Sequence, residues 1–214
     1  MRRLILTLAL AALPAMAGAQ SPGRGRPASF PTRDVAVTYR TSEGGEMRFF
    51  WRAADSTMRA EGLGDAGGAM IYDMRGRNMI MLMSAQRAYV RLPGDDDDRK
   101  GGVGSLALGD VKPGDTISRE GAAEIAGHRC TVWRVERAKE SPEDEAEVAR
   151  SCVTADGVLL RRVEGEGDEA ETSYLATRVA YGPQDPALFR APAGWRQMSL
   201  DELAKQIEEG VRKR

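Results

Sequence analysis

Apolar and polar residues alternate with a period of two along most of the chain, in short runs that recur about every ten residues. Gly, Asp and Asn residues separate the runs, as at Glu43-Gly44-Gly45 and Ala155-Asp156-Gly157. This pattern predicts a meander of antiparallel β-strands. The predicted strands cover residues 34–39, 46–52, 57–61, 69–73, 78–83, 87–92, 116–119, 130–135, 148–153, 158–164 and 171–181, with residues 124–127 leading into the strand that begins at 130.

The period changes near the C-terminus. Ser199 and Glu202 have the spacing of a capping box, in which the serine caps a helix and the glutamate reaches back to it. Leu200, Leu203, Ile207 and Val211 then recur on one helical face. We therefore expect a helix from about residue 200 to 212 that packs on the sheet, after a single helical turn at 185–189.

One predicted strand is apolar on both of its faces. Met79, Met81 and Met83 occur at every second position and share one face, while Ile80 and Leu82 occupy the other. Such a strand must be covered on both sides. We expect the methionines to line the inside of a curved sheet, because thioether side chains adapt to irregular apolar partners. Other candidates for the same lining are Phe49, Trp51, Trp133 and Trp195.

Cys130 and Cys152 are the same number of residues away from Ser141, which stands in a charged stretch between two predicted strands. A hairpin folded about Ser141 would place the two cysteines directly opposite each other, within the range of a disulfide. We expect a disulfide that closes this hairpin. Disulfides persist in oxidising compartments, so the pairing also predicts a location outside the cytoplasm.

The N-terminus has the features of a secretory signal peptide. Arg2 and Arg3 precede an apolar run of about ten residues, and Ala17-Gly18-Ala19 forms a small-residue cleavage site. The run is shorter than the roughly 20 residues that a membrane-spanning helix needs. We therefore divide the chain into a signal peptide at residues 1–19, a flexible tail at 20–33 with nothing to bury, and one domain at 34–214. The expected location is the periplasm or the exterior, in soluble form.

Composition excludes several kinds of function. The formal net charge is −1, and loss of the two leader arginines makes it more negative, which argues against nucleic acid as a partner. The chain has a single histidine, His128, and no nucleophile-elbow motif, so we expect no enzymatic activity. The run Asp95–Asp98 lacks the ligand spacing of a calcium loop and reads as a solvated loop. No cofactor and no carboxylate metal site are expected.

Three stretches carry a resemblance to known proteins: residues 73–80 with Tyr89, residues 125–160 around the cysteine hairpin, and residues 188–198 with the sequence Leu-Phe-Arg-Ala-Pro-Ala-Gly-Trp-Arg-Gln-Met. In this order the chain resembles the periplasmic outer-membrane-lipoprotein-carrier-like (LolA/LolB-like) half-barrel superfamily, including an uncharacterised domain family within it. The resemblance implies a mainly β fold, with a curved antiparallel sheet forming a half-barrel and a C-terminal helix.

Three functions remain open from the sequence. The first is a non-enzymatic periplasmic binding or carrier protein for a lipid-like or other apolar ligand. The second is an envelope interaction module that senses another protein. The third is a copper-handling protein, because alternating methionines such as Met79, Met81 and Met83 can bind Cu(I) through their thioethers.

Overall fold

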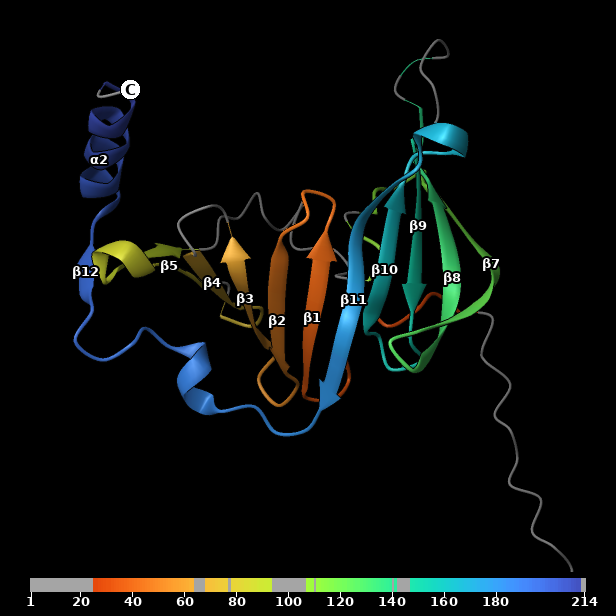
Figure 1. The fold of residues 1–214 in the computed structure, drawn as a ribbon, viewed down its shortest axis with the longest axis horizontal. Helices are drawn as coiled ribbons and strands as arrows, with labels where there is room; N and C mark the ends of the chain where they lie inside the picture. The colour runs from red at the N-terminus through yellow and green to blue at the C-terminus, as the bar shows by residue number, and fades with distance from the viewer. Residues whose placement is uncertain are drawn as a thin grey trace, which may run out of the picture.

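The computed structural model describes residues 25–63, 68–76, 78–93, 107–109, 111–139, 141 and 147–212. Their strands form one sheet of 12 strands with an α-helix at its end, which confirms the predicted fold class (Figure 1). The strands are β1 (Val35–Thr41), β2 (Glu46–Arg52), β3 (Thr57–Leu63), β4 (Gly68–Asp73), β5 (Asn78–Met83), β6 (Ala88–Pro93), β7 (Thr116–Ile125), β8 (His128–Glu136), β9 (Val148–Val153), β10 (Leu159–Glu164), β11 (Glu171–Tyr181) and β12 (Arg196–Met198). The helices are η1 (Ser84–Gln86), η2 (Gly167–Glu169), η3 (Pro186–Phe189) and α2 (Leu200–Arg212).

Two meanders meet in the middle of the sheet. The order is β12-β6-β5-β4-β3-β2-β1-β11-β10-β9-β8-β7, so the first strand pairs with the eleventh. Val35 lies opposite Tyr181 and Val37 opposite Val179 in this antiparallel junction. At the far end, β12 runs parallel to β6. The sheet is therefore mixed rather than wholly antiparallel, and the period-two pattern gave no sign of this short strand.

The sheet curves around one of its faces. Met58 on β3 and Gly157 in the β9–β10 turn line the same pocket, although three strands separate β3 from β10. On a flat sheet, four strand spacings would hold them about 19 Å apart. The hydroxyl of Tyr39 on β1 also reaches across β11 to donate to the carbonyl of Leu159, at 2.8 Å. The expected half-barrel curvature is thus present, and the sheet is not closed.

The opposite face of β2–β5 is covered by the segment after β11. Ile71, Ile80 and Leu82 are buried beneath Phe189 of η3, with Trp195 packed at the edge of this cluster. The guanidinium of Arg52 lies 4.6 Å from the centre of the Phe189 ring. This covering layer runs below the sheet in Figure 1, and it explains why Ile80 and Leu82 must be apolar.

The disulfide forms, but in a different register from the one expected. Cys130 on β8 and Cys152 on β9 are bonded, with their Cα atoms 5.4 Å apart. Cys152 lies opposite Val132, not opposite Cys130. The expected direct opposition is wrong because the hairpin is centred one residue later, so the bond joins the strands diagonally.

The C-terminal capping box is confirmed. The amide of Glu202 donates to the hydroxyl of Ser199 at 3.2 Å, and the carboxylate of Glu202 accepts from the Ser199 amide at 2.8 Å. Helix α2 rises from the end of β12 (Figure 1), and Leu203 packs against the cluster of Ala88, Val90 and Met198. Leu200 is 52% exposed, so it does not join the packed face. The side chains of Ile207 and Val211 lie outside the described residues.

Residues 1–19 and 95–98, on which the signal peptide and the aspartate loop were predicted, also lie outside the described residues. Within the part of the chain that the structure does describe, no helix is both long and apolar enough to cross a membrane.

Candidate functional site

The strand register gathers seven methionines on one face of β2–β5 and β12, which we call the methionine face. Met58 lies opposite Tyr72, and Tyr72 opposite Met79. Met70 lies opposite Met81, Met81 opposite Val90, and Val90 opposite Met198. Directly opposed residues point to the same side of a sheet, and residues two apart on one strand do so too. The methionine face therefore comprises Met47, Met58, Met70, Met79, Met81, Met83 and Met198.

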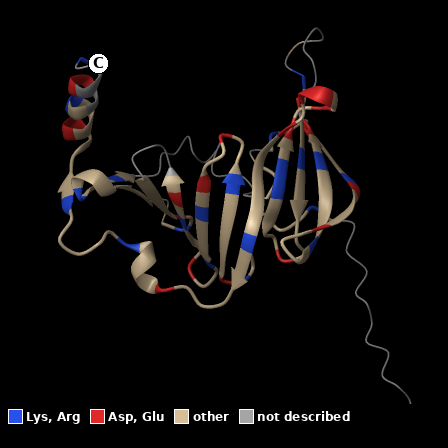
Figure 2. Cartoon of the chain, viewed as in Figure 1, with Lys and Arg blue, Asp and Glu red and all other residues tan. Residues whose placement is uncertain are grey.

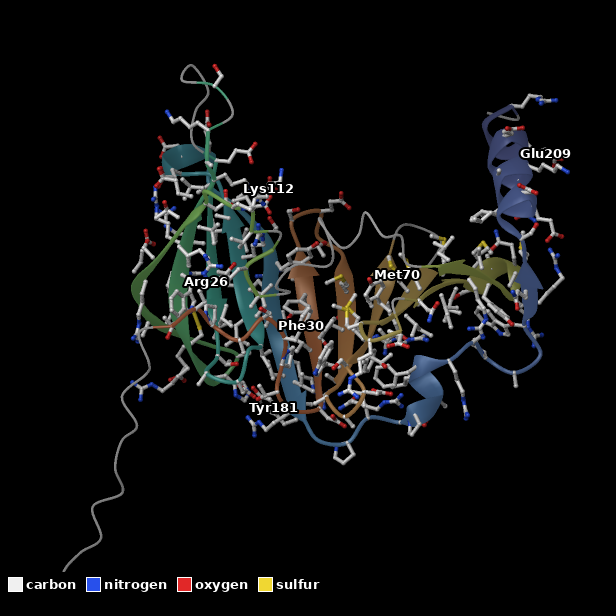
Figure 3. All side chains as sticks on the ribbon, turned by 180° about the vertical axis from the view of Figure 1, so that it is seen from behind. Arg26, Phe30, Met70, Lys112, Tyr181 and Glu209 are labelled. Atoms are coloured by element: carbon white, nitrogen blue, oxygen red, sulfur yellow. A yellow bond between two sulfur atoms is a disulfide. The ribbon has the colours of Figure 1, made fainter. Side chains whose placement is uncertain are left out.

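Most of these methionines are only partly covered. Met58 is 9% exposed and Met198 is 2% exposed, while the other five are half-buried. Sulfur atoms are visible around Met70 in Figure 3, which views the sheet from behind. Methionine is flexible and polarisable, so a partly covered cluster of this kind forms an adaptable apolar surface.

Methionines of this face line two open apolar pockets. One, of about 320 Å³, is lined by Met70, Met81 and Met83, by Ser84 and Gln86 of the β5–η1 corner, and by Gly68, Ala69 and Leu82, of which Ala69 and Leu82 belong to the apolar cluster of the opposite face. The other, of about 210 Å³, is lined by Met47, Met58, Ala60 and five further apolar or aromatic side chains from Pro31, Tyr39, Phe49, Val158 and Tyr174, with Gly157 and Leu159 completing its wall. We call them the Met81 pocket and the Phe49 pocket.

The two pockets adjoin. Ala60, which lines the Phe49 pocket, lies directly opposite Met70, which lines the Met81 pocket. Opposed residues on antiparallel strands have their Cβ atoms about 4.5–5.5 Å apart. The pockets are therefore neighbours across the β3–β4 pair.

The structure brings together most of the predicted lining residues. Phe49, Trp51 and Met79 belong to the largest apolar cluster, with Trp51 2% exposed and Met79 partly covered. Met81 and Met83 line the Met81 pocket. Among these five residues, Trp51 and Met79 line neither pocket, and Phe30 stacks on Trp51.

Two aromatic candidates lie elsewhere. Trp133 packs with Ala107, Leu108 and Val153 in a separate cluster on β8. Trp195 belongs to the cluster on the opposite face of β4 and β5. Neither shares the methionine face near the pockets, because strand order and the fold-back after β11 separate residues that composition alone groups together.

The N-terminal segment before β1 packs on the same side of the sheet. Phe30 stacks on Trp51 with ring centroids 5.4 Å apart and ring planes within 4° (Figure 3). Pro31 is buried and lines the Phe49 pocket. We expected residues 20–33 to have nothing to bury, and the described part of that range differs from this expectation. Phe30 and Pro31 supply the apolar surface that the Gly- and Arg-rich residues before them lack.

Asp156 in the β9–β10 turn anchors this segment. Its carboxylate accepts two hydrogen bonds from Arg33, at 2.8 and 3.1 Å, and one each from Thr154 and Tyr181. Burial on its own would raise the pKa of Asp156. The hydrogen bonds from Thr154, Arg33 and Tyr181 outweigh it, so the pKa of this carboxyl lies below its usual value.

Strands β8 and β9 carry a network of charged side chains. Arg134 and Arg150 lie opposite each other on β8 and β9, and Glu120 and Glu166 bridge them. The basic positions on β8–β10 and the acidic region near η2 are visible in Figure 2. All four side chains satisfy one another, so this is a charged lattice that covers the sheet.

The described residues offer little for catalysis or for carboxylate-bound metals. His128 begins β8, and its ring meets the edge of the Tyr181 ring at 5.6 Å. Among the described residues no group of three His, Cys, Asp or Glu side chains could hold a metal ion. The thioethers of the methionine face are a separate donor type, and the copper hypothesis stays open for them.

No protein-family model matches the chain, and no curated protein matches its sequence. Among solved structures, MucB matches with a TM-score of 0.51 at 12% identity, over 78% of this chain and 60% of MucB. MucB in its complex with MucA from Pseudomonas aeruginosa matches with a TM-score of 0.48 at 13% identity, over 75% of this chain and 56% of that one. A domain from Vibrio parahaemolyticus described as an outer membrane lipoprotein-sorting protein matches with a TM-score of 0.33 at 9% identity, over 75% of this chain and 92% of that one.

This chain shares the fold of MucB. At these identities the likeness carries no more than the fold, and the chain spans about 60% of MucB. Membership of the lipoprotein-carrier-like superfamily that the sequence resembles stays a prediction.

Sequence reasoning found residues of β2 and β5 at the site and missed those of β3, β4 and β12. Met47, Met58, Met70 and Met198 were not proposed, although each lies in a strand-like run. The period of two shows which residues of one strand share a face, but it does not show which faces of different strands coincide. Asp156 was seen only as part of a turn, and its contact with Arg33 spans 123 positions of the chain.

Proposed function

We propose that this protein is a non-enzymatic binding or carrier protein of the cell envelope, and that its methionine face accepts a lipid-like apolar ligand. The observation that carries the proposal is that the Met81 pocket and the Phe49 pocket lie side by side at the Ala60–Met70 pair. The Cys130–Cys152 disulfide and the signal-peptide pattern support a periplasmic or secreted location.

The lining determines the chemistry of the ligand. Among the residues that the structure describes, no charged side chain lines either pocket, and the polar side chains of the lining are those of Ser84, Gln86, Tyr39 and Tyr174. The hydroxyl of Tyr39 already donates to the Leu159 carbonyl. An apolar chain therefore loses no hydrogen bond on entering, whereas a charged group would lose hydration without gaining a partner.

The size of the pockets favours an elongated ligand. Sites for small molecules usually measure about 300–1,000 Å³. The Phe49 pocket falls below this range and the Met81 pocket lies at its lower end. A ligand that fills both must cross from β2 to β5, a distance of about 14 Å at normal strand spacing. A linear acyl chain has this shape.

Met81 provides the direct test, because it lies in the middle of the Met81 pocket wall. Met81→Lys should abolish binding of an environment-sensitive fatty-acid probe, since the ammonium group would have to be desolvated. Met81→Leu is the matched control: it keeps the apolar wall and should cost less than about 1.5 kcal/mol of stability. If the folded lysine variant binds the probe as well as wild type does, the methionine face is not the binding site.

The same two variants test whether the methionine face binds Cu(I). Met81→Leu removes a thioether but keeps the apolar surface. Loss of Cu(I) binding in this variant, with probe binding retained, would show that the methionines also serve a metal. A wild-type protein that binds neither probe nor Cu(I) would remove both functions.

A protein partner is the second candidate. MucB, whose fold this chain shares, has been solved in complex with MucA. An interaction module should leave its own envelope without a bound lipid. Native mass spectrometry of protein purified from that envelope separates the two candidates, because a lipid adds a small, extractable mass and a protein partner adds a large one.

A further inference from the structure

Residues Phe30–Arg33, which we call the strap, are held on the sheet in an unusual way. They form no strand, and each of the four consecutive residues contacts the domain: Phe30 meets Trp51, Pro31 meets the Phe49 pocket, and Thr32 and Arg33 both bind Asp156. The ring of Phe30 lies on Trp51, and Pro31 is buried in the wall of the Phe49 pocket. The amide of Thr32 donates to the Asp156 carbonyl at 2.9 Å, and Arg33 binds the Asp156 carboxylate.

The turn beneath the strap is shaped for a passing backbone. Gly157 has a φ of +90°, and a Cβ placed there would lie 2.5 Å from the Phe30 carbonyl oxygen and 3.0 Å from the Cβ of Ala28. A side chain at this position would push the strap away. Because Gly157 has no side chain, a main chain can pass close to this turn, next to the Asp156 carboxylate and the Trp51 ring.

The strap stacks on the Trp51 ring but does not bind its indole N–H. The indole N–H of Trp51 is buried where Phe30 stacks on this ring, and no described residue accepts a hydrogen bond from it. An unpaired buried donor costs about 1–3 kcal/mol. An occupant that placed an acceptor near this indole would gain this energy, and the strap does not.

We propose that the surface formed by Trp51, the Phe49 pocket and Asp156-Gly157 is a peptide-binding groove, and that the strap is its intramolecular occupant. The groove would accept a segment of another protein with an aromatic residue, a proline and, two positions after the proline, an arginine. This is the pattern of Phe30-Pro31-Thr32-Arg33. Each feature is recognised by a known mode: ring stacking, a proline in an aromatic-lined wall, and an arginine fork on a carboxylate.

The strap would regulate access to this groove. An attached segment competes at a high effective concentration, so a free peptide must outcompete it. The individual contacts are weak: Arg33 has an exposed fraction of 61%, and stacked aromatic pairs contribute about 0.5–1.5 kcal/mol. A partner segment that also paired the Trp51 indole could therefore displace the strap.

The test uses the full chain and a labelled synthetic peptide of residues 27–34. The protein variants are wild type and Phe30→Ala/Arg33→Ala, in which the strap loses its two specific side chains. We expect the peptide to bind the double variant at least about tenfold more tightly than wild type, because the competing segment is weakened. Control peptides with alanine at position 30 or glutamine at position 33 should bind the double variant at least about fivefold more weakly than the parent peptide.

Several outcomes would overturn the proposal. Equal binding of the peptide to both proteins, no binding to either, or equal binding of the parent and control peptides would each do so. A double variant that fails to fold would show that the strap is part of the core. Light scattering that reveals a dimer formed by exchange of straps would assign the groove to a second copy of this chain instead of another protein.

Hydrogen exchange of wild-type protein gives a check that needs no variant. The Thr32 amide, which is bonded to the Asp156 carbonyl, should exchange faster than the Ala36 amide in β1 if the strap opens on its own. Equal protection would contradict a displaceable strap. The proposal is also separable from apolar-ligand binding, because Met81→Lys should leave peptide binding to the double variant unchanged.

Discussion

Ala60 and Met70 lie directly opposite each other on β3 and β4, and each lines a different apolar pocket. The side chain of Ala60 is small and that of Met70 is flexible, so this pair is the point at which one ligand could span the two pockets. A ligand that occupies both pockets must pass this pair.

Replacing Ala60 with phenylalanine should therefore distinguish long ligands from short ones. The ring would fill the Phe49 pocket beside Met58, at a cost to stability of about 1–3 kcal/mol. We expect a long-chain fatty-acid probe to lose affinity by at least about tenfold, while a short-chain probe that fits the Met81 pocket alone keeps its affinity. Equal losses for both probes would show that the pockets do not act together.

The disulfide should contribute strongly to stability even though its cysteines are not directly opposed. The bond between Cys130 and Cys152 closes a loop with a sequence separation of 22. In the chain-entropy model, removing it lowers the free energy of unfolding by about 3 kcal/mol. Chemical denaturation of the Cys130→Ser/Cys152→Ser variant measures this loss, and thiol labelling of denatured, unreduced wild type should find no reactive cysteine.

The bond between Asp156 and Arg33 should make the strap sensitive to acid. Hydrogen bonding lowers the pKa of Asp156 in the folded state, so its stabilising effect is complete above the ordinary carboxyl pKa of about 3.9. The effect is lost as the pH falls through the lower, folded-state pKa. The difference in unfolding free energy between wild type and Asp156→Asn should be constant from pH 7 to about pH 5 and shrink below about pH 4. A difference that stays constant down to pH 2 would show that the ionised carboxylate stabilises nothing.

Ser199→Ala should weaken the start of α2. The lost cap normally costs about 1 kcal/mol. Because Leu203 is the helix residue described as packed on the sheet, we expect faster hydrogen exchange within α2 and little change in the melting temperature of the sheet. Ser199→Asp is the control, since aspartate also caps helices and should preserve protection. A large fall in the melting temperature would mean that the helix is integral to the core.

The sequence by itself determined the local structure of this protein. Period-two alternation located most of the strands, and the Ser199–Glu202 spacing gave the start of α2 within the described residues. It also identified the cysteine pair and the shared face of Met79, Met81 and Met83. These features depend on residues close together in the chain, where side-chain direction follows directly from backbone geometry.

Only the tertiary structure determined which distant residues come together on those strand faces. The pairing of β1 with β11 and the parallel pairing of β12 with β6 join distant parts of the chain, and the second of them places Met198 on one surface with Met81. A two-residue shift in the β8–β9 register, with Cys152 opposite Val132 instead of Cys130, turned a direct cysteine pair into a diagonal one. The contact between Arg33 and Asp156 likewise depends on the curvature of the sheet, because strand partners and register are set by the packing of the whole domain and not by any single run of residues.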